Sequence, residues 1–211
     1  VVLYKQGKYS EAKPLLGKAI KLLITAYGEC HPKVMEAQSN LAMLFSAQGR
    51  YLEAEKFFIQ ALEIGKHCLG AQHPRIATNM CNLAFCYIKQ EKYSAAEELL
   101  TEALDIQRKI YGKEHPDVAR GINNIAYLYD LQNRFEEAEP LYTEALEMRQ
   151  KLLGEEHPQV AVSLNNLATL YRLTSRYDEA RLFYDRALDI LESKLGDQHP
   201  LSMRVKTNLV K

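Results

Sequence analysis

The stretch GEEHPQVAVSLNNLATLYR, residues 154–172, contains a His-Pro pair, a doubled asparagine and a run of small and apolar residues. Its pattern recurs along the chain at a fixed interval. Histidine precedes proline at His31, His73, His115, His157 and His199, always 42 residues apart. A glycine stands three residues before each of these histidines and an asparagine nine residues after it. Five periods of 42 residues account for 210 of the 211 residues, which indicates a repeat protein.

The apolar residues of each period predict two helices. With the histidine as position 1, apolar residues at positions 4, 8, 11, 12 and 15 form one helical stripe. Proline at position 2 suits a first helical turn, so the histidine is predicted near the N-cap. A second helix is predicted after an aromatic at position 21, with Ser94 and Asp178 as N-caps and Pro140 in the first turn. The glycine before each His-Pro pair is predicted to end this helix in the αL conformation.

Each repeat is therefore predicted to be a helical hairpin. Small residues stand where its helices must approach closely, as with Ala126 on the first helix and Ala138 and Ala145 on the second. One hairpin cannot bury its apolar stripe alone, but stacked hairpins can. The predicted fold is an all-α, right-handed α-solenoid with a concave face lined by the first helices.

The repeat boundaries follow the His-Pro pairs. The prediction is one continuous domain with a partial repeat at residues 1–30, full repeats at 31–72, 73–114, 115–156 and 157–198, and a first or capping helix at 199–211. Both ends stop inside a repeat, so we expect a fragment of a longer protein. The ends expose apolar residues that are candidates for self-association, namely Val1, Val2 and Leu3 at one end and Val205, Leu209 and Val210 at the other.

Composition narrows the class of protein. The 27 Lys and Arg residues balance the 27 Asp and Glu residues, whereas binders of nucleic acid or membrane surfaces need a basic excess. No apolar run approaches the roughly 20 residues that a membrane-spanning helix needs. The four cysteines do not follow the repeat, which favours reduced thiols in a cytoplasmic protein over a disulfide framework.

The repeated motifs resemble a known family. Asn-Leu-Ala-x-Leu-Tyr, Gly-Arg-Tyr-x-Glu-Ala-Glu and Ala-Leu-x-Ile are similar to the tetratricopeptide repeat (TPR) pattern, whose usual unit has about 34 residues. The 42-residue version, with its longer second helix and its Gly-x-x-His-Pro joint, looks like that of kinesin light chains. Similar repeats occur in other scaffolds and in signalling ATPases that carry them as sensor domains. The resemblance implies a TPR adaptor for protein–protein interaction.

The asparagine at position 10 is expected to face the concave groove, beside positions 6, 9 and 13. Its side chain offers a donor and an acceptor, so it can hold the backbone of an extended peptide of any sequence. In kinesin light chains and other TPR domains the matching asparagine holds bound main chain, and the resemblance implies this role for Asn82, Asn124 and Asn166. The alternative is that each asparagine bonds to the neighbouring helix and serves packing.

The other groove positions vary between repeats, as specificity positions would. Arg149 resembles a kinesin light chain arginine that binds acidic cargo residues, and Arg120 is similar to a basic groove position there. With Arg172 and Arg204 these residues are candidates for a basic strip, because arginine grips carboxylates in a fork. The alternative for the arginines is ordinary solvated surface.

Aromatic residues and Met43 are candidates for an apolar pocket, with partial packing as the alternative. The predicted peptide-binding residues are Asn40, Asn82, Asn124, Asn166, Asn123, Asn165, Arg120, Arg149, Phe85 and Tyr127. A chaperone C-terminal tail is not the expected ligand, because its clamp needs a Lys or Arg where every repeat here has asparagine.

No pattern points to catalysis. Five equivalent histidines cannot all be catalytic, and the glycines lack the clustering and the Lys-Ser/Thr pair of a phosphate loop. The cysteines lack the paired spacing of a zinc site. We therefore predict a non-enzymatic scaffold without cofactor or metal, whose partner is a protein rather than nucleic acid or membrane. Its expected ligand is an extended peptide with a hydrophobic anchor and nearby Asp or Glu.

Two other functions remain open at this point. The chain could be a structural spacer or an oligomerisation module that stacks through its ends. It could also be a sensor or regulatory domain of a larger signalling ATPase. An RNA-binding solenoid is the weakest option, because the net charge is zero.

Overall fold

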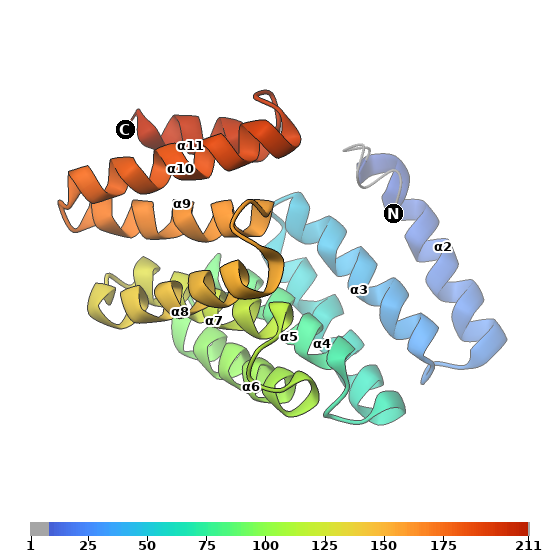
Figure 1. Cartoon of the computed structure of the whole chain (residues 1–211). Helices are drawn as coiled ribbons and strands as arrows, with labels where there is room; N and C mark the ends of the chain where they lie inside the picture. Colours follow the sequence, from blue (N-terminus) through green and yellow to red (C-terminus); the bar gives the residue numbers. More distant parts are fainter. Residues whose placement is uncertain (1–8, 211) are drawn as a thin grey trace. The chain divides into compact units, whose positions relative to one another are not determined.

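The computed structural model describes residues 9–210, and every regular element among them is an α-helix (Figure 1). The chain divides into two compact units, an N-terminal half (Val1–Ile110) and a C-terminal half (Tyr111–Lys211). The helices of the N-terminal half are α2 (Tyr9–Tyr27), α3 (Pro32–Ala47), α4 (Tyr51–Leu69), α5 (Pro74–Ile88) and α6 (Tyr93–Tyr111), which ends at the boundary. Those of the C-terminal half are α7 (Pro116–Leu131), α8 (Phe135–Leu153), α9 (Pro158–Leu173), α10 (Tyr177–Leu195) and α11 (Pro200–Leu209). The all-α fold class is confirmed, whereas Val1, Val2 and Leu3 lie outside the described residues.

A histidine caps each first helix, which is α3, α5, α7, α9 or α11. In all five joints the imidazole Nδ1 accepts a hydrogen bond from the backbone N–H two residues further on, as between His157 and Gln159 at 3.1 Å. The proline between them occupies the first helical turn. The predicted position of the histidine at the N-cap is therefore confirmed, and its role there is structural.

The glycine before each His-Pro pair turns the chain out of the preceding second helix. Its φ lies between 80° and 89° in all five joints. Its ψ is 153° at Gly70, 156° at Gly154 and 160° at Gly196. The positive φ agrees with the prediction, but these ψ values lie far from the αL region, so the predicted αL cap is wrong. The observed region is open essentially to glycine alone.

The second helices begin two residues earlier than predicted. Helix α6 starts at Tyr93 and helix α10 starts at Tyr177, so Ser94 and Asp178 lie inside the first turn rather than at the N-cap. Pro140 is the sixth residue of α8, one turn deeper than predicted. There it removes one N–H from the helical hydrogen-bond ladder, because proline has no amide hydrogen.

A basic residue stands at the start of the second helices instead of a polar cap. Arg176, at the N-cap of α10, makes no side-chain cap hydrogen bond. Its guanidinium lies 4.0 Å from the centre of the Tyr171 ring and 2.8 Å from the carboxylate of Glu139 in the preceding repeat. Lys92 lies in the same way over Tyr87 and pairs with Glu55. This contact ties one repeat to the one before it.

The apolar stripes form a core within each half. In the C-terminal half, Ala126, Ala138, Tyr142 and Tyr184 belong to one buried cluster that spans α7 to α11. Ala126, Ala138 and Ala145 have no exposed surface, which confirms the close helix contacts predicted for small residues. Because the apolar stripe of each first helix faces this core, its other side is left to face outward.

We expect His157→Ala to lower the free energy of unfolding by about 1 kcal/mol, because the N–H of Gln159 loses its acceptor at a helix N-terminus. His157→Asn should keep most of the stability, because asparagine is a good N-cap. Urea unfolding followed by circular dichroism measures both. Equal losses in the two variants would contradict the capping role.

Candidate functional site

The outward side of the first helices carries the residues predicted to bind a peptide, except Arg149, which lies on the second helix α8. We name this side the first-helix face and define it as positions 6, 9, 10 and 13 of each repeat. In the N-terminal half a pocket of about 250 Å³ opens on this face between α3 and α5. Its lining residues are Met35, Glu36, Ser39, Asn40, Met43, Arg75, Thr78, Asn79 and Asn82. The predicted Asn40, Asn82 and Met43 thus share one hollow, and the Arg75–Glu36 ion pair, at 3.1 Å, lies beside it.

The asparagines of the C-terminal half form bridges between neighbouring first helices. The Nδ2 of Asn166 donates to Oδ1 of Asn123 on the preceding first helix at 3.1 Å, and Asn208 donates in the same way to Asn165. Asn123 and Asn165 are 8% and 4% exposed, so they are buried acceptors that hold the position-10 asparagines of the next first helix in place. The amide nitrogen of Asn166 therefore bonds to the neighbouring helix, as the packing alternative predicts. Its Oδ1 accepts no hydrogen bond from the described residues.

The N-terminal half lacks this bridge. Position 9 is Ser39 there, and its hydroxyl donates to the carbonyl of Met35 at 2.9 Å. Asn40 and Asn82 are half-buried, and their side chains make no hydrogen bond within the part of the chain that the structure describes. Their donors and acceptors both stay available on the first-helix face.

Arg149 is a buried cation without a carboxylate partner among the described residues. Only 5% of it is exposed, and its Nη1 donates to Ser163 Oγ at 2.6 Å and to the Gln159 carbonyl at 3.3 Å. Its Nε is buried and has no acceptor. Burial, and next the nearby charge of Arg120, lower the pKa of Arg149 to about 10. Arg120 therefore lies on the solvated surface, where it is exposed and pairs with Asp117 at 2.8 Å. Arg149 does not lie on the solvated surface.

The predicted aromatic residues lie in different halves. Phe85 is 41% exposed, with its ring edge against Tyr51 at 6.3 Å between centroids and Lys89 over its face. Tyr127 is partly buried and packs at the edge of the core of the C-terminal half. Phe85 is thus accessible to a ligand. Tyr127 is partly packed, which is the alternative given for it above.

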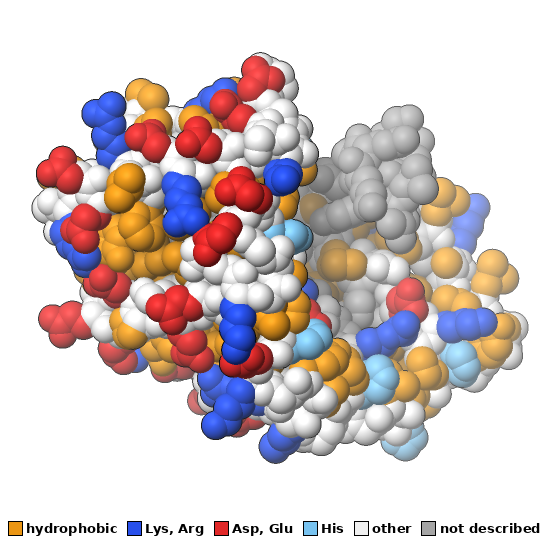
Figure 2. Space-filling view, in the orientation of Figure 1, with side chains coloured by type: hydrophobic (Ala, Val, Ile, Leu, Met, Phe, Trp, Pro, Cys, Tyr) orange, Lys and Arg blue, Asp and Glu red, His pale blue; other side chains and the backbone are white. Residues whose placement is uncertain are grey.

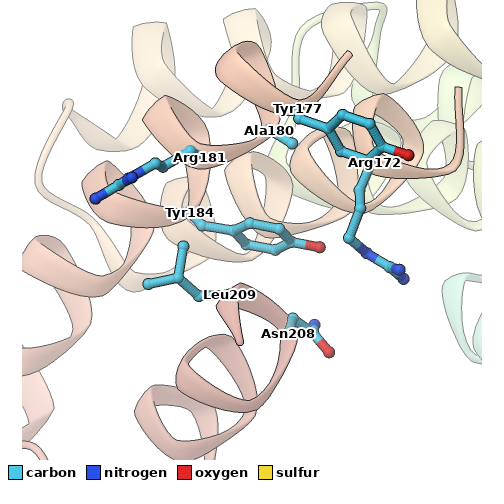
Figure 3. Close-up of a pocket in the computed structure, with 7 residues that line it drawn as sticks. All are labelled: Arg172, Tyr177, Ala180, Arg181, Tyr184, Asn208 and Leu209. Carbon is cyan, nitrogen blue, oxygen red and sulfur yellow. The ribbon is translucent and has the colours of Figure 1, made fainter. Parts of the chain in front are cut away.

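A larger pocket, of about 470 Å³, lies between α9, α10 and α11 (Figure 3). Its lining residues are Arg172, Tyr177, Ala180, Arg181, Tyr184, Asn208 and Leu209. Figure 3 shows Arg172, the Tyr184 hydroxyl and Asn208 on one side of the pocket, while Arg181 extends away. The Tyr184 hydroxyl lies 2.9 Å from Thr169 Oγ1, and the Nε of Arg172 is buried without an acceptor. Arg204, the last residue of the predicted basic strip, is exposed on α11.

Asp130 is a buried carboxyl that the sequence analysis did not single out. It is 9% exposed, and its Oδ1 has no hydrogen-bond partner. Burial raises the pKa of Asp130 from 3.8 to about 6. The matching residue of an earlier repeat is Ile88, which is also buried. An apolar residue at this position indicates burial, so the burial of Asp130 could be predicted from the sequence. The pKa of the buried Tyr142 is raised by burial first and next by the nearby Asp130.

Comparison with known proteins identifies the family. The tetratricopeptide repeat profile matches residues 1–66, 33–109, 75–151 and 134–193. The chain belongs to the TPR family. This confirms the family that the motifs predicted, and TPR repeats serve in general as non-enzymatic scaffolds for protein–protein interaction. No curated protein matches the chain by sequence.

Solved TPR structures resemble the chain over most of its length. BtubC (BKLC) from P. vanneervenii has 29% identity and a TM-score of 0.75, over 97% of this chain and 81% of that one. A single-residue variant of a kinesin light chain-like protein from Podosopora anserina, with nearly identical TPR-like repeats, has 26% identity and a TM-score of 0.75 over 90% of each chain. MamA, at 16% identity, a TM-score of 0.58, and coverage of 91% of this chain and 94% of its own, shares the fold alone. The predicted likeness to kinesin light chains is confirmed at the level of structure.

Two further observations describe this TPR chain. None of its described helices is long and apolar enough to cross a bilayer. Within residues 9–210 no three His, Cys, Asp or Glu side chains gather in a way that could hold a metal ion. Figure 2 shows Asp and Glu interspersed with Lys and Arg over the visible surface of the C-terminal half.

We expect Asp130→Asn to raise the free energy of unfolding at pH 7.5 by about 2 to 3 kcal/mol. The pKa of Asp130 is higher in the folded state than its ordinary value, so the wild type loses stability as pH rises from about 4 to 6. The variant should lack this loss. Urea unfolding at pH 4.0 and pH 7.5 tests this, and the same stability difference at both pH values would contradict it.

Proposed function

We propose that this chain is an adaptor that binds an extended peptide segment of a partner protein on its first-helix face. The observation that carries the proposal is the set of amides on that face whose hydrogen-bonding groups lack protein partners. Asn40 and Asn82 line one hollow, and Asn166 keeps a free Oδ1 beside its bridge to Asn123. An extended peptide backbone offers N–H and C=O groups that such amides can bind whatever its sequence.

The hollow between α3 and α5 adds an apolar contact to these amides. Met35 and Met43 lie in its wall, and methionine side chains adapt to differently shaped ligand groups. Phe85, exposed on α5, offers a second apolar surface in the same half. These residues support a ligand with a hydrophobic anchor.

Arg149 supports an acidic residue in the ligand. A buried guanidinium without a carboxylate partner costs free energy, and a carboxylate from a ligand would offset that cost. Arg120 on α7 lies near enough to lower the pKa of Arg149, so a carboxylate there would be attracted by two cations. Ser163 holds the guanidinium in place through its hydroxyl. We therefore expect the ligand to carry Asp or Glu, as predicted from the resemblance.

Three of the four cysteines, Cys30, Cys68 and Cys86, are free thiols. Free thiols fit a reducing compartment, and we therefore place the proposed interaction in the cytoplasm. Burial raises the pKa of Cys86 to about 11, so this thiol serves packing.

The main-chain contacts can be tested with peptides selected from a random 12-residue display library on the intact chain. The double variant Asn82→Leu/Asn124→Leu should weaken their binding at least tenfold, because leucine cannot bond to peptide groups. Its melting temperature should stay nearly unchanged, because neither side chain makes a hydrogen bond within residues 9–210. The matched control is Gln60→Leu, which makes the same kind of exchange at an exposed site on α4. Unchanged affinity in the double variant, measured by fluorescence anisotropy, would reject the proposal.

The acidic anchor is tested by Arg149→Met, which removes the charge and keeps an apolar side chain of similar length. Binding of selected peptides that contain Asp or Glu should fall at least tenfold, while unfolding stability should hold or rise, because a buried charge is removed. Peptides with these residues replaced by Asn or Gln serve as the control. The anchor is wrong if the variant still distinguishes the two sets of peptides as the wild type does.

A further inference from the structure

Asp130 is a charged residue that the fold does not need. The same position holds Ser46, Ile88 and Arg172 in the other repeats, so the helix packing accepts a small, an apolar or a basic side chain there. In Asp130 the carboxyl is nine-tenths buried and makes no hydrogen bond or ion pair with the described residues. Its ionised form is therefore left without compensation inside the protein, which costs free energy.

No cation of the described residues forms an ion pair with Asp130. The Tyr142 hydroxyl on α8 lies near Asp130, and Tyr127 on α7 lies near the same hydroxyl. Burial is the cause of the raised pKa of Asp130, and no neighbouring charge contributes to it. A cation from outside is the group that would compensate this carboxylate.

Arg172 holds the matching place on the next first helix. It stands 42 residues after Asp130, and its Nε is likewise buried without a partner. In Figure 3 its side chain runs from α9 toward the level of Asn208, and it lines the pocket between α9, α10 and α11. The two opposite charges therefore stand on adjacent first helices without forming an ion pair.

The amide bridges fix the register of these two charges. Asp130 stands seven residues after Asn123, and Arg172 stands seven residues after Asn165. Seven residues are close to two helical turns, so each charge lies on the same side of its helix as a bridging asparagine. The Asn166–Asn123 and Asn208–Asn165 bonds are equivalent contacts one repeat apart, so Asp130 and Arg172 occupy equivalent places on the adjacent first helices α7 and α9. Packed helices are about 8–10 Å apart, and residues three apart in a polyproline II segment lie on one side at about 9 Å.

We propose that Asp130 and Arg172 read the charge order of the bound segment: Asp130 receives a Lys or Arg side chain, and Arg172 receives an Asp or Glu side chain about three residues away. This inference rests on the proposed peptide-binding function and specifies its ligand. A ligand of this kind lies across α7 and α9 and offers an opposite charge both to the buried carboxyl of Asp130 and to the half-buried Arg172. The acidic residue at Arg172 is additional to the one assigned to Arg149.

The test uses the peptides selected on the intact chain and a double-mutant cycle. Peptides whose binding depends on Asn82 and Asn124 should be enriched in a basic residue three positions from an acidic one. Asp130→Ser should weaken such a peptide at least tenfold, yet hardly affect its Lys→norleucine analogue. Arg172→Ile should act in the same way on the acidic residue alone. Both replacements already occur at this position in other repeats, as Ser46 and Ile88, so the fold should tolerate them.

A pH series separates charge recognition from a structural role. Affinity for the Lys peptide should fall on acidification from pH 7.5 to pH 5, because Asp130 becomes protonated below about 6. The Asp130→Ser variant and the norleucine peptide should not show this fall. Amide-dependent peptides without the charge order, or additive effects in the cycle, would overturn the inference and leave the proposed function standing. If no selected peptide depended on Asn82 and Asn124, the proposed function and this inference would fail together.

Discussion

The joint Gly-x-x-His-Pro determines how each repeat of this chain follows the one before it. The glycine leaves the second helix with a φ between 80° and 89°, the histidine caps the next helix, and the proline fixes its first φ. All three act on the backbone, so the joint directs each helix whatever residues lie on the helix surfaces. The core then needs only small residues such as Ala126 and Ala138 at the close contacts. On the first-helix face, positions 6, 9 and 13 vary from repeat to repeat, while position 10 stays asparagine.

Two buried charged residues, Arg149 and Asp130, differ from the residues at the matching positions of the other repeats. At the position of Arg149 the other full repeats have the buried residues Gly65, Gln107 and Leu191, and the partial first repeat has the half-buried Leu23. A Cβ added at Gly65 would lie 2.6 Å from Ile76 Cδ1, so the N-terminal half closes the space that Arg149 fills in the C-terminal half. Asp130 replaces a buried isoleucine in the same way. Neither charge is required for packing, and each costs free energy until an opposite charge arrives. This cost links the scaffold to the proposed recognition of a charged ligand.

The features that could be predicted from the sequence depend on neighbours within one or two helical turns. The histidine caps, the buried alanines and the hairpin pattern are of this kind. The contact of Arg176 with Glu139 was missed because its partner lies 37 residues earlier in the chain. The burial of Arg149 does not follow from its charge, which favours the surface, but it agrees with Leu191 at the matching position, which is 1% exposed. In a repeat protein the matching residues report the burial of a position more directly than the residue itself does.

The asparagine bridges give the two halves different ways of holding a peptide backbone. In the C-terminal half, Nδ2 of Asn166 is fixed by Asn123, which sets the direction of its free Oδ1 before any ligand binds. In the N-terminal half, Ser39 bonds to its own helix, so Asn82 has no such fixed orientation. A side chain ordered in advance loses less conformational entropy on binding. The bridged asparagine therefore suits a single defined acceptor contact with a peptide N–H, whereas the unbridged ones suit a backbone whose position varies between ligands.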